Sequence, residues 1–143
     1  MDFSRLDHVP TIANVMTPFP YSVGIDDPVD RAHRLMEKHG IRHVPVQGSD
    51  GIVGVVSHHD LTEARNRGGT PRVRDACTVE PFTVDVSARL DAVALDMARR
   101  HLASAVVTKG GRLAGIFTAT DACRVLGELL RERFGPPEGD NAA

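Results

Sequence analysis

The amino-acid sequence repeats itself with a period of 61 residues, and this repeat restricts the chain to a few architectures. Residues 54–60, GVVSHHD, share the frame of residues 115–121, GIFTATD: a glycine, two apolar residues, a hydroxyl residue and, three places later, an aspartate. The same offset aligns further positions without a gap: Thr17 with Thr78, Pro20 with Pro81, Val23 with Val84, Asp30 with Asp91, Met36 with Met97 and Val46 with Val107. Chance does not match a whole register, so the chain contains two copies of one unit.

Each copy has the pattern of a strand, a helix, two strands and a second helix. In the first copy PYSV is extended, Asp26 or Asp27 caps a helix with Pro28 in its first turn, and Gly40 ends that helix. Two short apolar strands follow, and a second helix runs roughly over residues 60–66. The apolar helix faces comprise Val29, Ala32, Leu35 and Met36, then Leu90, Val93, Met97 and Ala98, and in the longer last helix Val125, Leu126, Leu129 and Leu130.

The predicted fold class is α/β, of the α+β kind, with two tandem β-α-β-β-α repeats related by a pseudo-twofold axis. One unit is too small to cover its own sheet, so we expect the two to pack back to back. We expect Phe3 and Leu6 to dock a short N-terminal helix. The predicted boundaries are an N-terminal extension at 1–10, the first repeat at 11–66, a linker at 67–71, the second repeat at 72–134 and a disordered tail at 135–143.

Composition excludes several classes of function. The 143 residues carry a net charge of -2 with both signs mixed, which gives no basis for binding a nucleic acid. The N-terminus lacks a signal peptide, and no apolar run reaches the roughly 18 residues of a membrane span. We therefore expect a cytoplasmic protein with no membrane contact. Cys77 and Cys123 are expected to be two buried thiols rather than a disulfide.

Histidine and serine spacing does not predict catalysis or metal binding. No two of the seven histidines stand at i, i+4 on one predicted helix together with an acid, which is the pairing that a catalytic zinc site needs. Ser57 is close to two histidines but lacks the second glycine of a nucleophile elbow. We therefore expect no catalytic residues, no metal and no required cofactor.

The repeated seven-residue segment allows two interpretations. A hydroxyl residue followed three places later by an acid is a helix-capping pattern, and it occurs at Ser57 and again at Thr118. The glycine ahead of it favours a binding site, because a strand residue without a Cβ lets another group approach closely. A carboxylate at a helix N-terminus can accept hydrogen bonds from both hydroxyls of a ribose. The segment is thus a cap that also suits a nucleoside.

Taken together, MTP at the start, IRHVPV in the middle and G-h-h-[ST]-x-x-D at the end resemble a tandem pair of CBS domains, or Bateman module, over residues 11–126. The resemblance implies that the two repeats form a cleft that binds AMP, ADP, ATP or S-adenosylmethionine as a regulatory ligand. It also implies a flat homodimer and a stand-alone regulatory protein, not an enzyme. Since no output segment is fused to the repeats, we expect signalling to an unknown protein in trans.

Carried over by position, the resemblance implies a main ligand site made by both repeats. Asp121 would hold the ribose diol, backbone around residues 19–21 and at Ile41 would read the adenine edge, and Arg42 and His43 would contact phosphate. The alternative for Arg42 is a solvated cation at a strand end. The whole predicted set is Thr17, Tyr21, Ile41, Arg42, His43, Pro45, Thr118, Thr120 and Asp121.

A mirror-related second site would use Ser57, Asp60, Thr78, Phe82, Leu102 and Ser104. Residues 103–104 are Ala-Ser where residues 42–43 are Arg-His, so this site is expected to take a nucleoside, a sulfonium compound without phosphate, or nothing. His58 and His59 would lend it positive charge at mildly acid pH. The alternative function for the whole chain is a ligand-free module for protein interaction and dimerisation.

Overall fold

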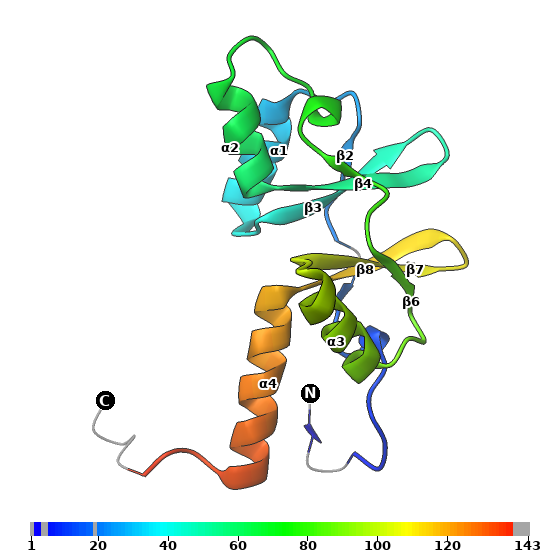
Figure 1. The fold of residues 1–143 in the computed structure, drawn as a ribbon, viewed down its shortest axis with the longest axis vertical. Helices are drawn as coiled ribbons and strands as arrows, with labels where there is room; N and C mark the ends of the chain where they lie inside the picture. Colours follow the sequence, from blue (N-terminus) through cyan, green and yellow to red (C-terminus); the bar gives the residue numbers. More distant parts are fainter. Residues whose placement is uncertain (1, 4–5, 19, 139–143) are drawn as a thin grey trace.

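The computed structural model describes residues 2–3, 6–18 and 20–138, which fold into two halves that meet through their sheets (Figure 1). The elements up to the linker are η2 (Ile12–Asn14), β1 (Thr17–Pro18), β2 (Val23–Gly24), α1 (Val29–His39), β3 (His43–Gly48), β4 (Gly51–Ser57) and α2 (His58–Asn66). The elements after it are η3 (Val73–Asp75), β5 (Thr78–Val79), β6 (Thr83–Asp85), α3 (Leu90–Arg100), β7 (Ser104–Lys109), β8 (Arg112–Thr118) and α4 (Ala119–Phe134). The predicted mixed class with two similar units is confirmed.

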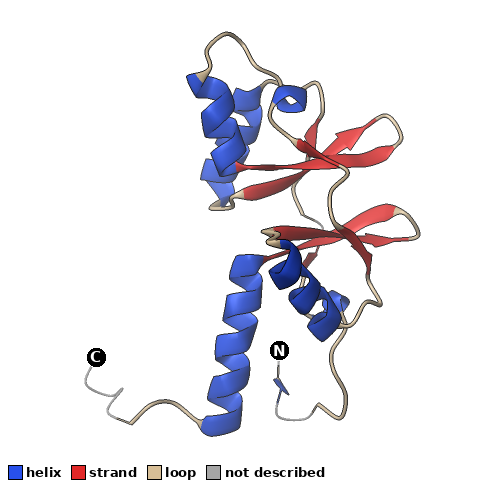
Figure 2. Cartoon of the chain, viewed as in Figure 1, coloured by secondary structure: helices blue, strands red, loops and turns tan. Residues whose placement is uncertain are grey.

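The sheets lie at the middle of the molecule and the helices lie beyond them at either end (Figure 2). One sheet has the strand order β2-β3-β4-β5 and the other has the order β1-β8-β7-β6. In each sheet the inner hairpin is antiparallel, and one outer strand, β2 or β6, runs parallel to its neighbour. The remaining outer strand comes from the other repeat: β1 pairs with β8, and β5 pairs with β4.

This exchange involves two short arms, residues 11–18 and residues 72–79, which are equivalent in the repeat. Ile12 and Val15, from the first arm, are buried in the core of the second half. Val73, from the second arm, is buried in the core of the first half, and Ala76 and Cys77 pack against that core. The repeats of the sequence and the halves in space are therefore different divisions of the chain.

Two glycines make the strand exchange possible. A Cβ on Gly54 would lie 2.5 Å from the carbonyl oxygen of Thr78 in β5. A Cβ on Gly115 would lie 2.3 Å from the sulfur of Met16 and 2.9 Å from the carbonyl oxygen of Thr17 in β1. The sequence correctly indicated a close approach at these glycines, but the group that approaches is the exchanged arm of the other repeat.

Helix boundaries differ from the predictions in two places. Pro28 is the N-cap of α1, which begins at Val29, and Asp27 instead accepts a hydrogen bond from the backbone N–H of Gly24 at 2.7 Å. Helix α2 begins at His58 because Ser57 caps it, two residues earlier than expected. Gly40 ends α1 with a φ of 62°, as predicted. Over the described ranges, every helix is too short or too polar to cross a bilayer.

The apolar faces of the second repeat are less buried than predicted. Ala98 is exposed in α3, and Leu126, Leu129 and Leu130 of α4 remain 56%, 39% and 47% exposed, whereas Val125 is buried. Helix α4 runs on past the sheet (Figure 1), and Leu126 and Leu129 line a cavity of about 720 Å³ together with Phe3 and Leu6 of the N-terminal segment. Cys123, on the same helix, is also exposed, which corrects the expectation of two buried thiols; both cysteines are free, as expected.

The N-terminal segment docks on the second half. Phe3 is buried in the second core and Leu6 packs against that core, as the sequence indicated. The predicted short helix at this place includes residues 4 and 5, which lie outside the described residues, as do residues 139–143 of the predicted disordered tail. The second half therefore carries an additional apolar layer.

The Gly54→Ala substitution should destabilise the fold by about 1–3 kcal/mol, because the new methyl group overlaps the β5 backbone and must push the exchanged arm away. The free energy of unfolding, measured by urea titration, checks this. Thr78→Ala is the matched control: it keeps the carbonyl but trims an exposed side chain, and it should cost less than about 0.5 kcal/mol. Equal losses of unfolding free energy in the two variants would contradict a close contact between Gly54 and the β5 backbone.

Candidate ligand site between the repeats

A cavity of about 690 Å³ lies where the two halves meet. Both repeats line it, so neither half forms it alone. Its first-repeat residues are Thr17, Pro18, Pro20, Tyr21, His39, Gly40, Ile41, Arg42 and His43, and its second-repeat residues are Ile116, Thr118, Thr120 and Asp121. The structure thus brings together the predicted main-site residues, with Pro45 as the exception. Pro45 is fully buried within β3 and does not line the cavity. Phe19 lies outside the described residues.

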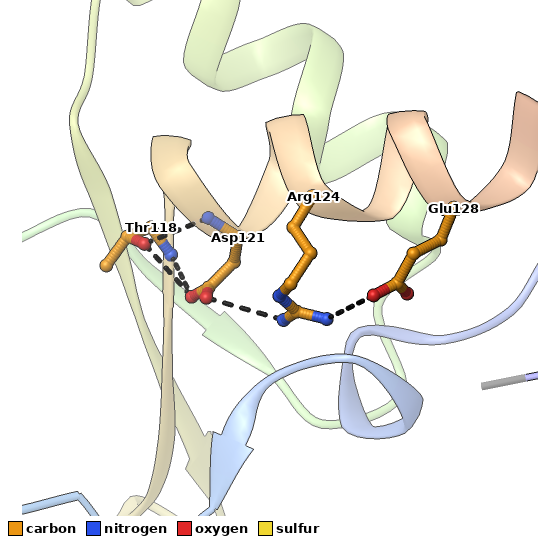
Figure 3. Close-up of polar contacts among 4 residues, drawn as sticks. All are labelled: Thr118, Asp121, Arg124 and Glu128. Carbon is orange, nitrogen blue, oxygen red and sulfur yellow. Dashed lines mark hydrogen bonds and ion pairs between the residues drawn. The ribbon is translucent and has the colours of Figure 1, made fainter. Parts of the chain in front are cut away.

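The acidic end of the cavity is the cap of α4 (Figure 3). Asp121 Oδ2 accepts hydrogen bonds from the backbone N–H of Thr118 at 2.9 Å and from its hydroxyl at 3.0 Å. The Thr118 hydroxyl oxygen in turn accepts from the backbone N–H of Asp121 at 3.2 Å. Asp121 Oδ1 has a looser contact, 3.5 Å from an Arg124 amino group. The capping interpretation is therefore confirmed. Asp121 Oδ2 accepts both cap hydrogen bonds, whereas Oδ1 has only the looser contact with Arg124.

The cationic end of the cavity lies at the start of β3. The backbone carbonyl of Arg42 accepts from the first N–H of α2, on His58, at 2.8 Å, just as Ala103 accepts from Ala119 at 2.9 Å in the second repeat. This bond holds the backbone of Arg42 in place. Within the part of the chain that the structure describes, the Arg42 guanidinium forms no hydrogen bond or ion pair. An exposed cation at a cavity, without a carboxylate partner, is suited to bind an anion.

His43 is more buried than Arg42, and its protonation responds to its surroundings. Burial is the largest influence and lowers the pKa of the imidazole below its ordinary value of 6.5. The Asp60 carboxylate raises the pKa, and the Arg42 cation lowers it further. At pH 7 this places a neutral His43 beside a charged Arg42 at the edge of the cavity.

An aromatic stack forms another wall of the cavity. The Tyr21 and His39 rings are 3.7 Å apart between centroids and inclined by only 13°. Their equivalents in the second repeat, Phe82 and Arg100, also contact each other, with the guanidinium 4.8 Å from the ring centroid. The sequence analysis included the aromatic position but missed His39. The signal that could have identified it is the basic residue that ends the first helix of each repeat.

The second predicted set is not gathered around this cavity. Asp60 forms the same cap as Asp121: its carboxylate accepts from the Ser57 N–H at 3.2 Å, and its own N–H donates to the Ser57 hydroxyl at 3.1 Å. Phe82 and Leu102 pack against the second core, Ser104 is buried and Thr78 is exposed. His58 tilts against His33 of α1, with centroids 5.3 Å apart, and His59 lies 3.5 Å from Glu63. A cation that the sequence analysis did not include, Arg100, lies over the ring of Phe82, a member of this set.

Solved structures share this architecture. The structure of CBSX2 in complex with AMP is 26% identical in sequence, with a TM-score of 0.73, and the match covers 85% of this chain and 98% of that one. The CBS domain pair of protein MJ0100, in complex with 5'-methylthioadenosine and S-adenosyl-L-methionine, is 20% identical with a TM-score of 0.78 over 85% of this chain and 98% of that one. The second similarity shows the fold alone.

Two sequence relatives differ in length. The uncharacterized protein YlbB of Bacillus subtilis (strain 168) is 32% identical over 140 residues, which cover 91% of this chain and 93% of that protein. An inosine-5'-monophosphate dehydrogenase of Korarchaeum cryptofilum (strain OPF8) is 36% identical over 101 residues, or 70% of this chain. The matched part is 21% of that dehydrogenase, so the similarity spans about a fifth of its length.

The family comparison agrees with the internal repeat. The CBS domain matches twice, at residues 12–67 and 73–128, which together make up most of the chain. Both matches contain the capped aspartate and the preceding glycine described above. This chain therefore belongs to the CBS domain family and carries two CBS domains in tandem.

Proposed function

We propose that this chain is a regulatory module that binds an adenosine compound in the cavity between its two CBS domains. The observation that carries the proposal is the pairing of two chemically different ends in one cavity: the Asp121 cap from the second repeat and the exposed Arg42 cation from the first. The volume of about 690 Å³ lies within the usual range of small-molecule sites. The complex of CBSX2 with AMP supports the ligand class.

The acidic end suits the sugar of the ligand. Asp121 Oδ2 is held by two donors of Thr118, which fixes the orientation of the carboxylate. Oδ1 then accepts from a ribose hydroxyl, while Arg124 contributes only a 3.5 Å contact that the ligand can displace. Thr120 lines the same end and offers a second hydroxyl.

The other surfaces suit the base and the phosphate. Ile41 and Ile116, one from each repeat, supply apolar contact for an adenine ring beside the Tyr21–His39 stack. Arg42 supplies a permanent positive charge, and His43 supplies a proton when an anion is present. This combination favours a phosphorylated ligand such as AMP, ADP or ATP over 5'-methylthioadenosine or S-adenosylmethionine.

The regulatory step is a shift between orientations of the two halves. A ligand held by both repeats stabilises the orientation in which Arg42 and Asp121 lie closest to their ligand groups, by no more than its difference in affinity for the two states. We propose that the module acts as a homodimer and reports this change to a partner protein in trans. The alternative is a ligand-free module that acts through protein interaction and dimerisation alone. Calorimetric titration with adenosine compounds tests it.

Arg42→Gln should weaken AMP binding about 10- to 100-fold, because a charge-assisted hydrogen bond of roughly 1.5–3 kcal/mol is lost. The affinity for adenosine, which lacks the phosphate, should change less than about twofold. Isothermal titration calorimetry measures both, with Arg34→Gln, an exposed arginine of α1 outside the cavity, as control. Equal losses for AMP and adenosine would show that Arg42 does not contact phosphate.

Asp121→Asn should weaken the binding of AMP and of adenosine by about tenfold each. The amide has one oxygen instead of two, so when that oxygen accepts the cap hydrogen bonds, no oxygen is left to accept from the ribose hydroxyl. The matched control is Asp75→Asn, which makes the same change in the cap of η3, outside the cavity. Absence of binding heat for AMP, ATP and S-adenosylmethionine with the unmodified chain would instead leave surface interaction as the function.

AMP binding should become tighter as the pH falls from about 8 to 6, and His43→Gln should remove part of this gain. The pKa of His43 is lowered in the free protein, and a bound phosphate raises it, so binding takes up a proton and acid pH favours the complex. The second ionisation of the phosphate itself, near pH 6, affects both proteins equally. Calorimetric dissociation constants at several pH values check this, and identical pH profiles for the two proteins would contradict it.

A further inference from the structure

The cavity of about 720 Å³ beside α4 is a second candidate binding site. Three parts of the second half form its walls: the N-terminal segment, α3 and α4. Phe117 of β8, which is fully buried, also lines it. None of its lining residues lines the cavity between the repeats, so the two cavities are separate. We call this second one the helix cavity.

The helix cavity lies where the second repeat has small side chains and the first repeat has large ones. In the first half, the rings of His33 on α1 and His58 on α2 lie 5.3 Å apart between centroids and bridge the two helices. Leu61 of α2 is fully buried. The residues 61 positions later are Ala94, Ala119 and Ala122, and the first and last of these line the helix cavity. The side chains that fill the space between α1 and α2 are thus missing between α3 and α4.

An ion pair that joins the helices of the first half has no equivalent in the second. Arg65 of α2 lies 3.5 Å from Asp30 of α1. The equivalent residues are Leu126 of α4 and Asp91 of α3, and Asp91 instead lies 2.9 Å from Arg89. In Figure 1, α1 and α2 lie side by side, whereas α4 extends away from α3. Apolar side chains of α3 and α4 therefore face a space that neither helix fills.

The N-terminal segment is fixed to both of these helices. Phe3 is buried, and its backbone N–H donates a hydrogen bond to the Glu132 carboxylate near the end of α4. The Pro10 carbonyl accepts from the backbone N–H of Leu90, the first residue of α3, at 2.9 Å. The third wall of the helix cavity is therefore held in place by hydrogen bonds to the other two.

The lining of the helix cavity is apolar apart from its rim. Asp7, His8 and Asp91 are its polar lining residues, and all three are exposed. Along α4 the lining runs from Ala122 to Leu129, which is two helical turns or roughly 10 Å. An apolar cavity is unsuited to ordered water, and the burial of apolar ligand surface drives binding. The length and the lining together favour an extended hydrocarbon chain.

The charges at the rim favour certain head groups. Two carboxylates, Asp7 and Asp91, lie there with one imidazole, His8, and Arg89 offsets only Asp91. A carboxylate or phosphate head group would be repelled, whereas an uncharged or cationic one would not. We propose that the helix cavity binds a molecule with a hydrocarbon chain and an uncharged or cationic head group.

Such a ligand accounts for two exposed leucines. Leu95 is 64% exposed and Leu126 is 56% exposed, and the first repeat has the exposed residues Arg34 and Arg65 at these positions. The fold therefore does not require leucine there, and a bound chain would remove apolar surface of both side chains from water. This ligand differs from an adenosine compound in chemistry and in place, so the site goes beyond the regulatory cavity proposed above.

Displacement of a fluorescent probe tests the site. N-phenyl-1-naphthylamine, an uncharged apolar fluorophore, should bind saturably with one molecule per chain. Lauroylglycerol and dodecyltrimethylammonium, each below its micelle-forming concentration, should displace it, and dodecanoate should need an at least roughly tenfold higher concentration. Saturating AMP should leave the probe bound. The absence of saturable binding, displacement by AMP, or equal displacement by dodecanoate would overturn the proposal.

Substitutions locate the probe within the chain. Ala94→His combined with Ala122→Leu restores the first-repeat side chains, so it should fill the helix cavity and weaken probe binding at least about tenfold. Ala98→Leu, at an exposed position of α3 outside the cavity, is the control and should change the affinity less than about twofold. Leu126→Arg alters an exposed side chain, needs no repacking of the core, and should weaken binding at least about fivefold.

Circular dichroism and thermal unfolding establish which of these variants fold. A folded Ala94→His, Ala122→Leu variant that binds the probe as tightly as the unmodified chain would overturn the proposal. The same result for Leu126→Arg would also overturn it.

Discussion

The contact between a glycine of one repeat and the backbone of the other is the constraint on which the rest of the structure depends. Gly54 and Gly115 leave room for β5 and β1 to complete the sheets of the opposite halves. Because the chain must return from β1 to β2, Pro18, Pro20 and Tyr21 lie at the boundary between the halves. This return brings Tyr21 beside the Asp121 cap and the start of β3, so the exchange of arms also creates the cavity.

The two repeats share a frame but have diverged in their chemistry. Both caps use a hydroxyl and an aspartate in the same geometry. The cations differ: the first repeat has Arg42 at the cavity and His39 on its aromatic ring, whereas the second has alanine at position 103 and Arg100 on Phe82. Of two equivalent positions in the repeat, one therefore lines the cavity between the halves and the other lies outside it. The helices have diverged as well: Arg34 and Arg65 of the first repeat stand where the second repeat has Leu95 and Leu126.

Much of the fold and most of the cavity lining follow from the sequence, and the failures have physical reasons. The 61-residue period determines the order of the elements, and residues that are 61 positions apart occupy equivalent positions in the two repeats. Periodicity says which side of a strand is apolar but not which sheet a two-residue strand joins, so the exchange of β1 and β5 could not be predicted. Pro45 was carried over by position from the family pattern, but it is fully buried in β3 between Val44 and Val46, which are buried as well.

The leucines of α4 show a related limit. A stripe of Leu126, Leu129 and Leu130 has the same pattern whether it faces its own core or another molecule. Only the length of the sheet beneath the helix separates these cases, and that length is a property of the fold, not of the helix sequence. His39 was missed for a different reason: its role depends on a ring 18 positions earlier in the chain, which the stack brings within 3.7 Å.

The exchanged arms also determine how the chain can be divided. A cut between Asn66 and Pro71 would give two fragments, each with a sheet that lacks an outer strand and with an arm that has lost its core. Each fragment carries the strand that the other is missing, together with the buried isoleucine or valine that anchors it. The two pieces are therefore natural complements for reassembly from separate polypeptides, and the glycine-containing linker serves mainly to keep them at high local concentration.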